Sequence, residues 1–432
     1  MNMKNTIWSK SIIIIILLIQ FLISSCSKDN IPDIKYDAEP IEYDLTIQST
    51  ENEVYQEALQ QLLNKYLPNA LSTKDHASLP ADLLARFQRI EEKMLKISDS
   101  LQISGVKCLS VIFNSTGVDK KLLKVSGKIY LPNQVAPIKG IIVANHVLIT
   151  DNASAPSQSI QIESLFAFMG YVVVMSDYIG FGATVDLPQT FLAQEITAKS
   201  SIDLTLTTYK YLKEKGYKFQ YPDNRVNIIG YSQGGAVALA CQKMIESYYQ
   251  KEFKIKKTYA GGAPYDLEYT FRQLLDDKKS GLPLPYIALA ITSLNYGENL
   301  NVDISKYFKG KLLQNYEEWL YSKRYNSTQL EKLIGTSDIR EILSDSALDY
   351  SGDLIKPFIR ALKKNSLIEW VPKAPIYLYH SIQDEYIPVY NTQEAYESFK
   401  KHSSASIELD LGNYGYHVAA AFDFYFKVFE KI

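Results

Sequence analysis

The chain has 432 residues, with 46 Lys and Arg against 48 Asp and Glu, and a formal net charge of -2 at pH 7. Because no basic run accompanies this charge, the composition argues against nucleic acid as a partner. Hydrophobic residues make up 46% and charged residues 22%, which is ordinary for a globular protein, and the length suits one large domain with an insertion, or two domains. Walker A, dinucleotide-binding and zinc-spacing motifs are not found in the sequence.

Residues 1–26 have the sequence pattern of a bacterial lipoprotein signal peptide. Lys4 and Lys10 give a positive start, residues 12–23 form a short apolar core, and Cys26 follows the small residues at which such signals are cut. The apolar core is shorter than a comfortable membrane span, although an uncleaved anchor helix is the alternative. We expect lipid on Cys26 to hold the protein on a membrane of the bacterial cell envelope.

The polar residues that follow Cys26 resemble those of surface-exposed lipoproteins, which places the outer membrane among the expected locations. Residues 27–50 are polar and contain prolines, so they read as a tether. Residues 51–105 have apolar positions at helical spacing and predict an N-terminal helical segment. Cys108 and Cys241 are expected as buried thiols rather than as a disulfide.

Strand patterns begin at residues 106–113 and 122–131, which we interpret as an antiparallel pair at a sheet edge. Short apolar runs and helical patterns then alternate, with strands expected at 140–144, 170–175, 226–229 and 257–261 and a helix at 160–169. This alternation is typical of a mostly parallel sheet covered by helices on both faces. The fold class predicted for residues 106–265 and 371–432 is therefore α/β.

The pattern G-x-S-x-G lies between the strand at 226–229 and a helix-forming run, and is built from Gly230, Ser232 and Gly234. In this context the pattern predicts a nucleophile elbow, a sharp turn that tolerates only small neighbours and exposes its serine. Ser232 is the expected nucleophile. The backbone N–H of Gln233, at the start of the helix, would point at a developing oxyanion.

Residues 266–370 interrupt the alternation with about a hundred Tyr-rich residues of helical pattern and no clear strand. We interpret this insertion in an otherwise regular α/β unit as a cap. Apolar and aromatic positions such as Tyr286 and Leu289 suggest that the cap roofs the active site and selects the substrate. A rigid cover of the sheet edge, without a role in binding, is the alternative.

With the elbow, the strand order and the insertion, the chain resembles the α/β-hydrolase superfamily, in particular its serine esterases and lipases. The resemblance runs from residue 106 to the C-terminus, and implies a triad in the chain order Ser, acid, His. Asp384 lies in a segment similar to the family pattern His-Gly-x-x-Asp-x-x-Val-Pro, with Ser381 in place of the glycine. His417 follows the last expected strand, at 406–411, and is the expected base.

Other residues compete for these roles. Glu385 lies one residue from the family position of the acid, and Asp410 alternates within a strand. His76 and His402 fall in helical and polar-loop segments, and His380 occupies the position of a structural strand-end histidine.

Two further segments are similar to family motifs. His146 occupies the place of the histidine in the His-Gly oxyanion motif, which makes the N–H of Val147 the expected second oxyanion donor, although valine replaces the usual glycine. Asp177 and Tyr178 lie in a segment similar to the Asp-Tyr-x-Gly turn of secretory lipases. Substrate contact is one interpretation of His146, Tyr178 and Tyr286, and a structural turn is the other for residues 177–178.

The function expected from the resemblance is hydrolysis of small-molecule or lipid esters through an acyl-enzyme on Ser232. We expect no metal or organic cofactor, because the three residues and the backbone donors suffice for this chemistry. A serine peptidase with the same triad is an alternative within enzymes. A surface binding lipoprotein that kept the fold and lost activity is an alternative outside them, because fold alone does not specify function.

Overall fold

The computed structural model describes residues 44–432, except 56, 59–60, 62–80 and 277–281. The expected signal peptide, Cys26, His76 and most of the expected tether lie outside the described residues. The described part contains one sheet of nine strands in the order β1-β2-β3-β5-β4-β6-β7-β8-β9. The strands are β1 (Leu45–Glu53), β2 (Val106–Thr116), β3 (Leu122–Pro132), β4 (Ile141–Asn145), β5 (Val172–Ser176), β6 (Arg225–Tyr231), β7 (Lys254–Gly261), β8 (Ile376–Ser381) and β9 (Ile407–Gly412).

The sheet is parallel from β5 to β9 and antiparallel at its other end. Parallel pairs join β5 to β4, β4 to β6, and onward to β9. Antiparallel pairs join β1 to β2, β2 to β3, and β3 to β5. The mostly parallel sheet predicted from the alternating pattern is thus present.

The N-terminal boundary differs from the sequence prediction. Strand β1 occupies residues 45–53, for which the sequence predicts a tether up to residue 50 and a helical segment from residue 51. Strand β1 covers the outer side of β2, so β2 and β3 do not form the edge of the sheet as expected. The sequence did not predict β1 because most side chains of this edge strand are exposed and polar. Such a strand lacks the alternation of apolar and polar residues by which strands are predicted.

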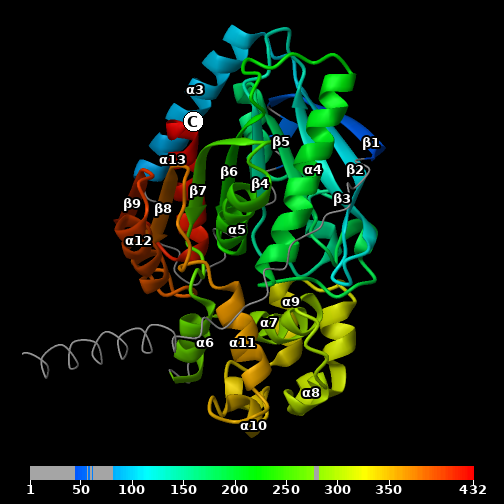
Figure 1. Cartoon of the computed structure of the whole chain (residues 1–432), viewed down its shortest axis with the longest axis vertical. Coiled ribbons are helices and arrows are strands. Elements are labelled where there is room, and N and C mark those ends of the chain that lie inside the picture. The colour runs from blue at the N-terminus through cyan, green and yellow to red at the C-terminus, as the bar shows by residue number, and fades with distance from the viewer. Residues whose placement is uncertain (1–43, 56, 59–60, 62–80, 277–281) are drawn as a thin grey trace, which may run out of the picture. The chain divides into compact units, whose positions relative to one another are not determined.

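Helices cover both faces of the sheet (Figure 1). The larger ones are α3 (Ala81–Leu101), η2 (Ile162–Met169), α4 (Gln194–Glu214), α5 (Gln233–Tyr248), α12 (Tyr390–His402) and α13 (His417–Lys431), and the short ones are η1 (Asn152–Ser154) and η3 (Gly182–Thr184). The element expected at 160–169 is therefore helical, but as a 3-10 helix. Cys108 and Cys241 are buried free thiols, as expected.

The central strands are apolar along their length because both faces are buried. In β4, Ile141 and Val143 belong to the core beneath α4 and α5, whereas Ile142 and Ala144 belong to the core beneath α13 and η2. Successive side chains of a strand point to opposite faces, so one apolar run serves two cores. Burial of each large aliphatic side chain contributes about 1.5–3 kcal/mol.

Helix α4 is buried on most sides although many of its residues are polar. Side-chain hydroxyl groups of α4 form hydrogen bonds to backbone carbonyls of the same helix. Thr205 Oγ1 donates to the carbonyl of Ser201 and Thr208 Oγ1 donates to that of Leu204, both at 2.7 Å. The buried carboxylate of Asp203 pairs with Lys199 and accepts a hydrogen bond from Ser115 on β2. The helix therefore lies against the sheet without unsatisfied hydroxyl groups at these positions.

Between β7 and β8 the described residues form helices, in a segment that we call the cap (residues 266–370). Its elements are α6 (Leu267–Asp276), α7 (Leu284–Gly297), η4 (Ile304–Lys306), α8 (Gly310–Tyr316), η5 (Glu317–Tyr321), α9 (Ser327–Ile334), η6 (Ile339–Glu341), α10 (Asp345–Leu348) and α11 (Lys356–Asn365). The cap has a hydrophobic core of its own, and lies at the lower end of the sheet in Figure 1. Among all described residues, no helix is long and apolar enough to cross a membrane.

Candidate active site

Ser232 lies in the sharp turn between β6 and α5. Its backbone has φ 55° and ψ -126°, a conformation that residues other than glycine rarely adopt. The strand ends at Tyr231 and the helix begins at Gln233, so the whole change of direction falls on the serine. This is the strained turn that the motif predicts.

The glycines on either side of Ser232 are required by close backbone approach. A Cβ atom on Gly230 would lie 2.0 Å from the carbonyl oxygen of Gly234, and one on Gly234 would lie 2.0 Å from the carbonyl oxygen of Asn145. Any side chain at either position would collide with rigid backbone. The first turn of α5 is thereby held against both β6 and the end of β4.

Three side chains meet at this turn in a hydrogen-bonded chain. His417 Nε2 lies 2.9 Å from Ser232 Oγ, and His417 Nδ1 lies 2.6 Å from Asp384 Oδ2. Asp384 is on the loop after β8 and His417 is the first residue of α13. The structure therefore brings together the three residues that the sequence nominated as nucleophile, base and acid, at the carboxyl end of the parallel strands.

The Asp384 carboxylate is fully buried and is surrounded by hydrogen-bond donors. Its Oδ1 accepts the backbone N–H groups of Tyr386 and Ile387 at 2.9 and 2.8 Å. Its Oδ2 also lies 3.3 Å from Nε2 of His380. Burial raises the pKa of Asp384, but the hydrogen bonds from His380 and His417 outweigh burial and hold this pKa below its ordinary value.

An ionised Asp384 fixes the orientation of His417. A carboxylate can only accept, so Nδ1 of His417 carries the proton in this hydrogen bond. The lone pair of neutral Nε2 is then free to accept the Ser232 hydroxyl proton. The arrangement can therefore generate a serine nucleophile.

Two contacts that sequence reasoning missed hold the backbone of His417. Its N–H donates to Oε2 of Glu385 at 2.8 Å, and its carbonyl accepts from the hydroxyl of Tyr231 at 2.9 Å. The Tyr231 ring also packs on the imidazole, with ring centroids 5.1 Å apart. Tyr231 lies within the elbow motif and Glu385 is adjacent to Asp384. These positions next to the expected site residues are the signal in the sequence that could have pointed to the two contacts.

The rival acids and histidines occupy other places. Asp410 accepts hydrogen bonds from the hydroxyls of Tyr377 and Tyr414 and pairs with Lys427, and Glu385 binds the backbone of His417 rather than its ring. His402 is exposed at the end of α12. His380 is fully buried, with Nε2 3.0 Å from the carbonyl of Ile387, in keeping with a structural role.

The two expected oxyanion donors flank the elbow. Gln233 is the first residue of α5, where a backbone N–H has no intrahelical acceptor. Val147 follows β4 and is 37% exposed. The close contact of Gly234 with the carbonyls of Asn145 and His146 brings the two segments together. The assignment of these N–H groups as oxyanion donors stays a prediction.

His146 and Tyr178 form a buried stacked pair. Their ring centroids are 4.0 Å apart, and the two residues are 4% and 2% exposed. His146 Nδ1 donates to the carbonyl of Val147 at 2.7 Å. The neighbouring Asp177 accepts hydrogen bonds from the Ser157 backbone and the Ser126 hydroxyl. The pair thus supports the backbone around Val147, and a substrate contact for either residue stays a prediction.

The cap reaches the three-residue cluster through aromatic rings. Tyr286 on α7 packs edge-on against Tyr386, which in turn packs against the imidazole of His417. Leu289 is 1% exposed and belongs to the core of the cap, so our expectation that it lines the roof was wrong. Helical spacing identified an apolar face of α7, but that face points into the cap. Substrate contact by Tyr286 stays a prediction.

Within the residues that the structure describes, no group of three or more His, Cys, Asp and Glu side chains is placed to hold a metal ion. The chemistry available at the site is that of the hydroxyl, the imidazole and the carboxylate, together with backbone N–H groups.

Comparison with known proteins identifies the family. The family described as secretory lipase matches residues 152–423. The chain is 23% identical over 240 residues to a secreted triacylglycerol lipase of Malassezia restricta, an alignment that covers 54% of this chain and 47% of that lipase. The chain thus spans about half the length of this relative.

Solved structures share the fold. The rice cell wall degrading esterase LipA from Xanthomonas oryzae has a TM-score of 0.67 at 22% identity, over 79% of this chain and 92% of that chain. A protein of Legionella pneumophila has a TM-score of 0.70 at 19% identity, over 90% and 98%. Candida antarctica lipase A has a TM-score of 0.56 at 17% identity, over 74% of each chain. The fold is that of the α/β hydrolases.

The packing at the elbow predicts the effect of adding one methyl group. Gly234→Ala places Cβ against the Asn145 carbonyl, and we expect the free energy of unfolding to fall by about 1–3 kcal/mol or more, measured by urea denaturation. Gly117→Ala is the matched control, because its Cβ would meet the movable end of the Asp119 side chain. Equal stability of the two variants would contradict the close approach.

Proposed function

The chain belongs to the secretory lipase family, and from this premise we propose that it hydrolyses carboxylic esters through an acyl-enzyme on Ser232. The observation that carries the proposal is the hydrogen-bonded chain from Ser232 Oγ through His417 to the buried Asp384 carboxylate. Nucleophile, base and orienting acid are in contact, which is the arrangement that serine hydrolysis requires.

In the first half-reaction, Ser232 Oγ attacks the ester carbonyl while His417 Nε2 accepts the hydroxyl proton. The resulting imidazolium is stabilised by the Asp384 carboxylate at 2.6 Å from Nδ1. Collapse of the tetrahedral intermediate breaks the bond to the alcohol oxygen, which takes the proton from Nε2. The alcohol leaves, and the acyl group remains on Ser232.

The negative oxygen of the tetrahedral intermediate needs donors already in place. The N–H of Gln233 at the start of α5, aided by the helix dipole, is one, and the N–H of Val147 is the other. Removal of one such donor in an enzyme of this kind costs about 2.7–4 kcal/mol of transition-state stabilisation. In the second half-reaction, His417 activates water, and the same steps release the acid.

The ester substrate is proposed from the family and not from a bound molecule. The Malassezia restricta relative is a triacylglycerol lipase and the Xanthomonas oryzae structure is a cell wall degrading esterase. We infer an ester of a small molecule or lipid for this chain. A peptidase would use the same three residues, so amide substrates belong in the test.

Ser232→Ala and His417→Ala test the mechanism. We expect each to lower kcat for p-nitrophenyl esters by about 10³- to 10⁶-fold with the fold retained, because the three residues act as a unit. His402→Ala, at an exposed histidine, is the control and should retain full activity. Circular dichroism would verify folding, and a fluorophosphonate probe should label the natural protein but not Ser232→Ala.

Three outcomes would contradict parts of this proposal. Normal turnover of Asp384→Asn together with loss in Asp410→Asn would move the acid to Asp410. Hydrolysis of aminoacyl-nitroanilides in preference to esters would make the protein a peptidase. Absence of both hydrolysis and labelling would indicate a binding protein with the hydrolase fold.

The cap is proposed to roof the site and to select the acyl or alcohol part of the substrate. The ring contacts from Tyr286 through Tyr386 to His417 support this placement. Binding contacts made at a distance from the reacting bond change selectivity more than intrinsic chemistry. The alternative is a cap that only covers the sheet edge.

Tyr286→Ala should change the order of kcat/KM across esters of increasing acyl length, by about 10-fold for the most affected ester. Tyr316→Ala is the control, because this ring packs on Phe308 and Tyr321 within the cap. A uniform small loss for every ester in both variants would favour a cover without a role in binding.

We also propose that lipid on Cys26 anchors the protein to a membrane of the bacterial cell envelope. Cys26→Ser removes the acylated sulfur, so the protein should move from the membrane fraction to the soluble fraction, measured by immunoblot after fractionation. Ser27→Ala leaves the cysteine intact and should remain with the membrane. If Cys26→Ser still fractionates with the membrane, an uncleaved helix over residues 12–23 is the anchor.

A further inference from the structure

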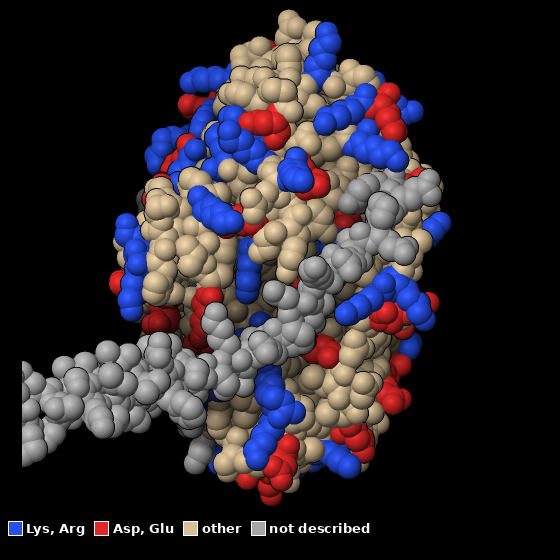
Figure 2. All heavy atoms as spheres, in the orientation of Figure 1, with Lys and Arg blue, Asp and Glu red and all other residues tan. Residues whose placement is uncertain are grey.

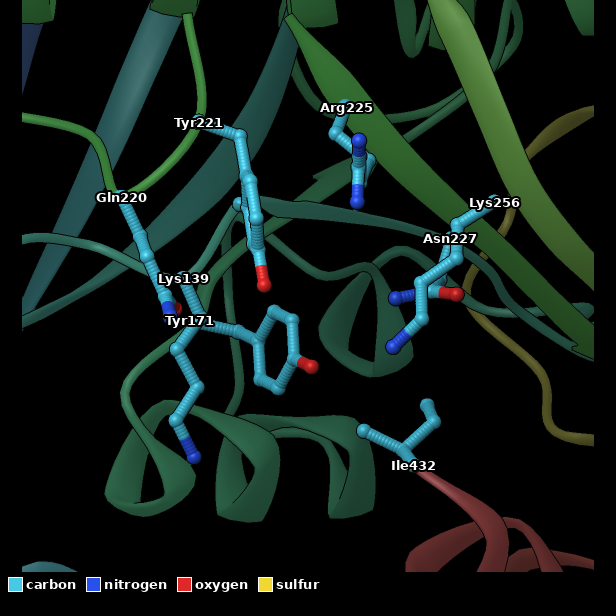
Figure 3. Close-up of a pocket in the computed structure, with 9 residues that line it drawn as sticks. Lys139, Tyr171, Gln220, Tyr221, Arg225, Asn227, Lys256 and Ile432 are labelled. Atoms are coloured by element: carbon cyan, nitrogen blue, oxygen red, sulfur yellow. The ribbon is translucent and has the colours of Figure 1, made fainter.

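A small cavity lies at the amino ends of strands β4 and β6, away from the candidate active site. It has a volume of about 220 Å³ and is lined by Lys139, Gly140, Tyr171, Gln220, Tyr221, Arg225, Asn227, Lys256 and Ile432 (Figure 3). Arg225 is the first residue of β6, and Ser232 comes directly after the last residue of this strand. At about 3.3 Å per residue, the cavity and the serine are separated by roughly 20 Å of strand.

Polar groups from four elements converge on this cavity. In Figure 3 the hydroxyls of Tyr171 and Tyr221, the amide of Asn227 and the ammonium of Lys256 border the same central space, with the Arg225 guanidinium directed toward it. The ammonium of Lys139 is directed away, along the ring of Tyr171. Tyr171 and Asn227 are 5% and 2% exposed, so the wall of the cavity is built into the fold.

The lining of the cavity contains positively charged side chains and no Asp or Glu side chain. Among the described residues, no ion pair is formed by Lys139 or Lys256. Arg225 pairs with Asp223 outside the lining, at 2.9 Å, but its Nε–H is buried without an acceptor within the described structure. Two residues of the lining thus carry a donor without a partner among the described residues, Arg225 at Nε and Lys256 at its ammonium. An oxyanion in the cavity would supply acceptors for such donors.

The positive groups also destabilise one another. Partial burial and the nearby Arg225 lower the pKa of Lys256, and burial together with Lys256 and Lys93 lowers the pKa of Lys139. A bound anion would relieve this repulsion. Figure 2 shows Lys and Arg side chains across the upper part of the view, with Asp and Glu side chains among them.

Contacts with neighbouring residues fix the position of Arg225 in the absence of a ligand. Arg225 stacks on Tyr221, with Cζ 4.1 Å from the ring centroid, and its carbonyl accepts the hydroxyl of Tyr209 at 2.9 Å. Asn227 lies two residues later on the same strand, so its amide stays on the same side of the sheet as Arg225. Little conformational entropy would be lost on binding, which favours affinity.

We propose that this cavity binds a phosphate group, with Arg225, Lys256, Asn227 and the two tyrosine hydroxyls as donors. Its volume is below that of pockets for drug-sized ligands, about 300–1,000 Å³, and suits a small anion or the phosphate end of a larger molecule. Cationic and neutral donors around one centre match an oxyanion with several acceptor oxygens. The phosphate can be free, or carried by a soluble ester or a lipid headgroup.

The test is isothermal titration calorimetry of the full-length protein with inorganic phosphate at constant ionic strength. We expect saturable binding with one phosphate per chain. Lys256→Gln should weaken Kd about 10-fold or more, and Tyr171→Phe about 5-fold, because each removes one donor. Lys254→Gln is the matched control: it removes the same charge from the same strand, outside the cavity, and should leave Kd unchanged.

Two further binding experiments identify the molecule that carries the phosphate group. Tighter binding of glycerol 3-phosphate than of phosphate would identify a soluble ester. Retention on phosphatidylglycerol vesicles, but not on phosphatidylcholine vesicles, lost in Lys256→Gln and kept in Lys254→Gln, would identify a lipid headgroup. A Cys26→Ser background removes the proposed lipid anchor from the vesicle comparison.

Two results would overturn the proposal. One is the absence of saturable binding to phosphate, glycerol 3-phosphate and the vesicles alike. The other is equal weakening by Lys256→Gln and Lys254→Gln, which would reduce the effect to general attraction by surface charge. Ester hydrolysis by Lys256→Gln should match that of the natural protein, because Lys256 lies at the other end of the sheet from Ser232, so this proposal and the proposed hydrolase function can fail separately.

Discussion

The close approach of β6, α5 and the end of β4 is the constraint on which the site depends. Gly230 and Gly234 have no room for a Cβ, because backbone carbonyls occupy the space. The chain can pass from strand to helix there only if one residue absorbs the whole change of direction, and Ser232 does so at φ 55°. Packing of the surrounding strands and helix holds this strained residue in place. Strain, exposure of the hydroxyl and the position of Gln233 at a helix N-terminus therefore have one common cause.

A second constraint is the buried charge of Asp384. A buried carboxylate without hydrogen-bond donors would be costly. The loop after β8 supplies two backbone N–H groups to it, and the imidazoles of His380 on β8 and His417 on α13 complete its surroundings. The same donors fix its direction, and the direction of Oδ2 fixes the ring of His417. Glu385 and Tyr231 hold the backbone of His417 from either side. The stability of this loop and the orientation of His417 thus cannot be separated.

The sequence predicted the parallel sheet, the strained turn and the three residues that meet there, because each leaves a local signal: buried strands are continuous apolar runs, and the elbow needs glycines at fixed spacing. It failed where the signal is carried by tertiary contacts. Strand β1 is polar because it is an exposed edge, Leu289 faces the core of the cap rather than the site, and the hydrogen bonds from Tyr231 and to Glu385 join segments over 30 residues apart. No periodicity records such contacts.

The two ends of the parallel sheet carry different chemistry for a topological reason. All carboxyl ends of β4, β6, β7 and β8 meet at one edge, where the loops of the elbow, the acid and the cap converge. The amino ends meet at the opposite edge, where the chain enters each strand from a helix or loop. The register of β6 and β7 shifts there, because Val226 pairs with Ile255 and Asn227 with Lys257. Lys256 is the extra residue of β7 at this shift, and it lines the cavity together with Arg225 and Asn227. Strand β6 joins the two edges, because it begins at Arg225 in the lining of the cavity and ends at Tyr231, next to Ser232. The proposed phosphate site and the proposed catalytic site therefore lie at opposite edges of one sheet.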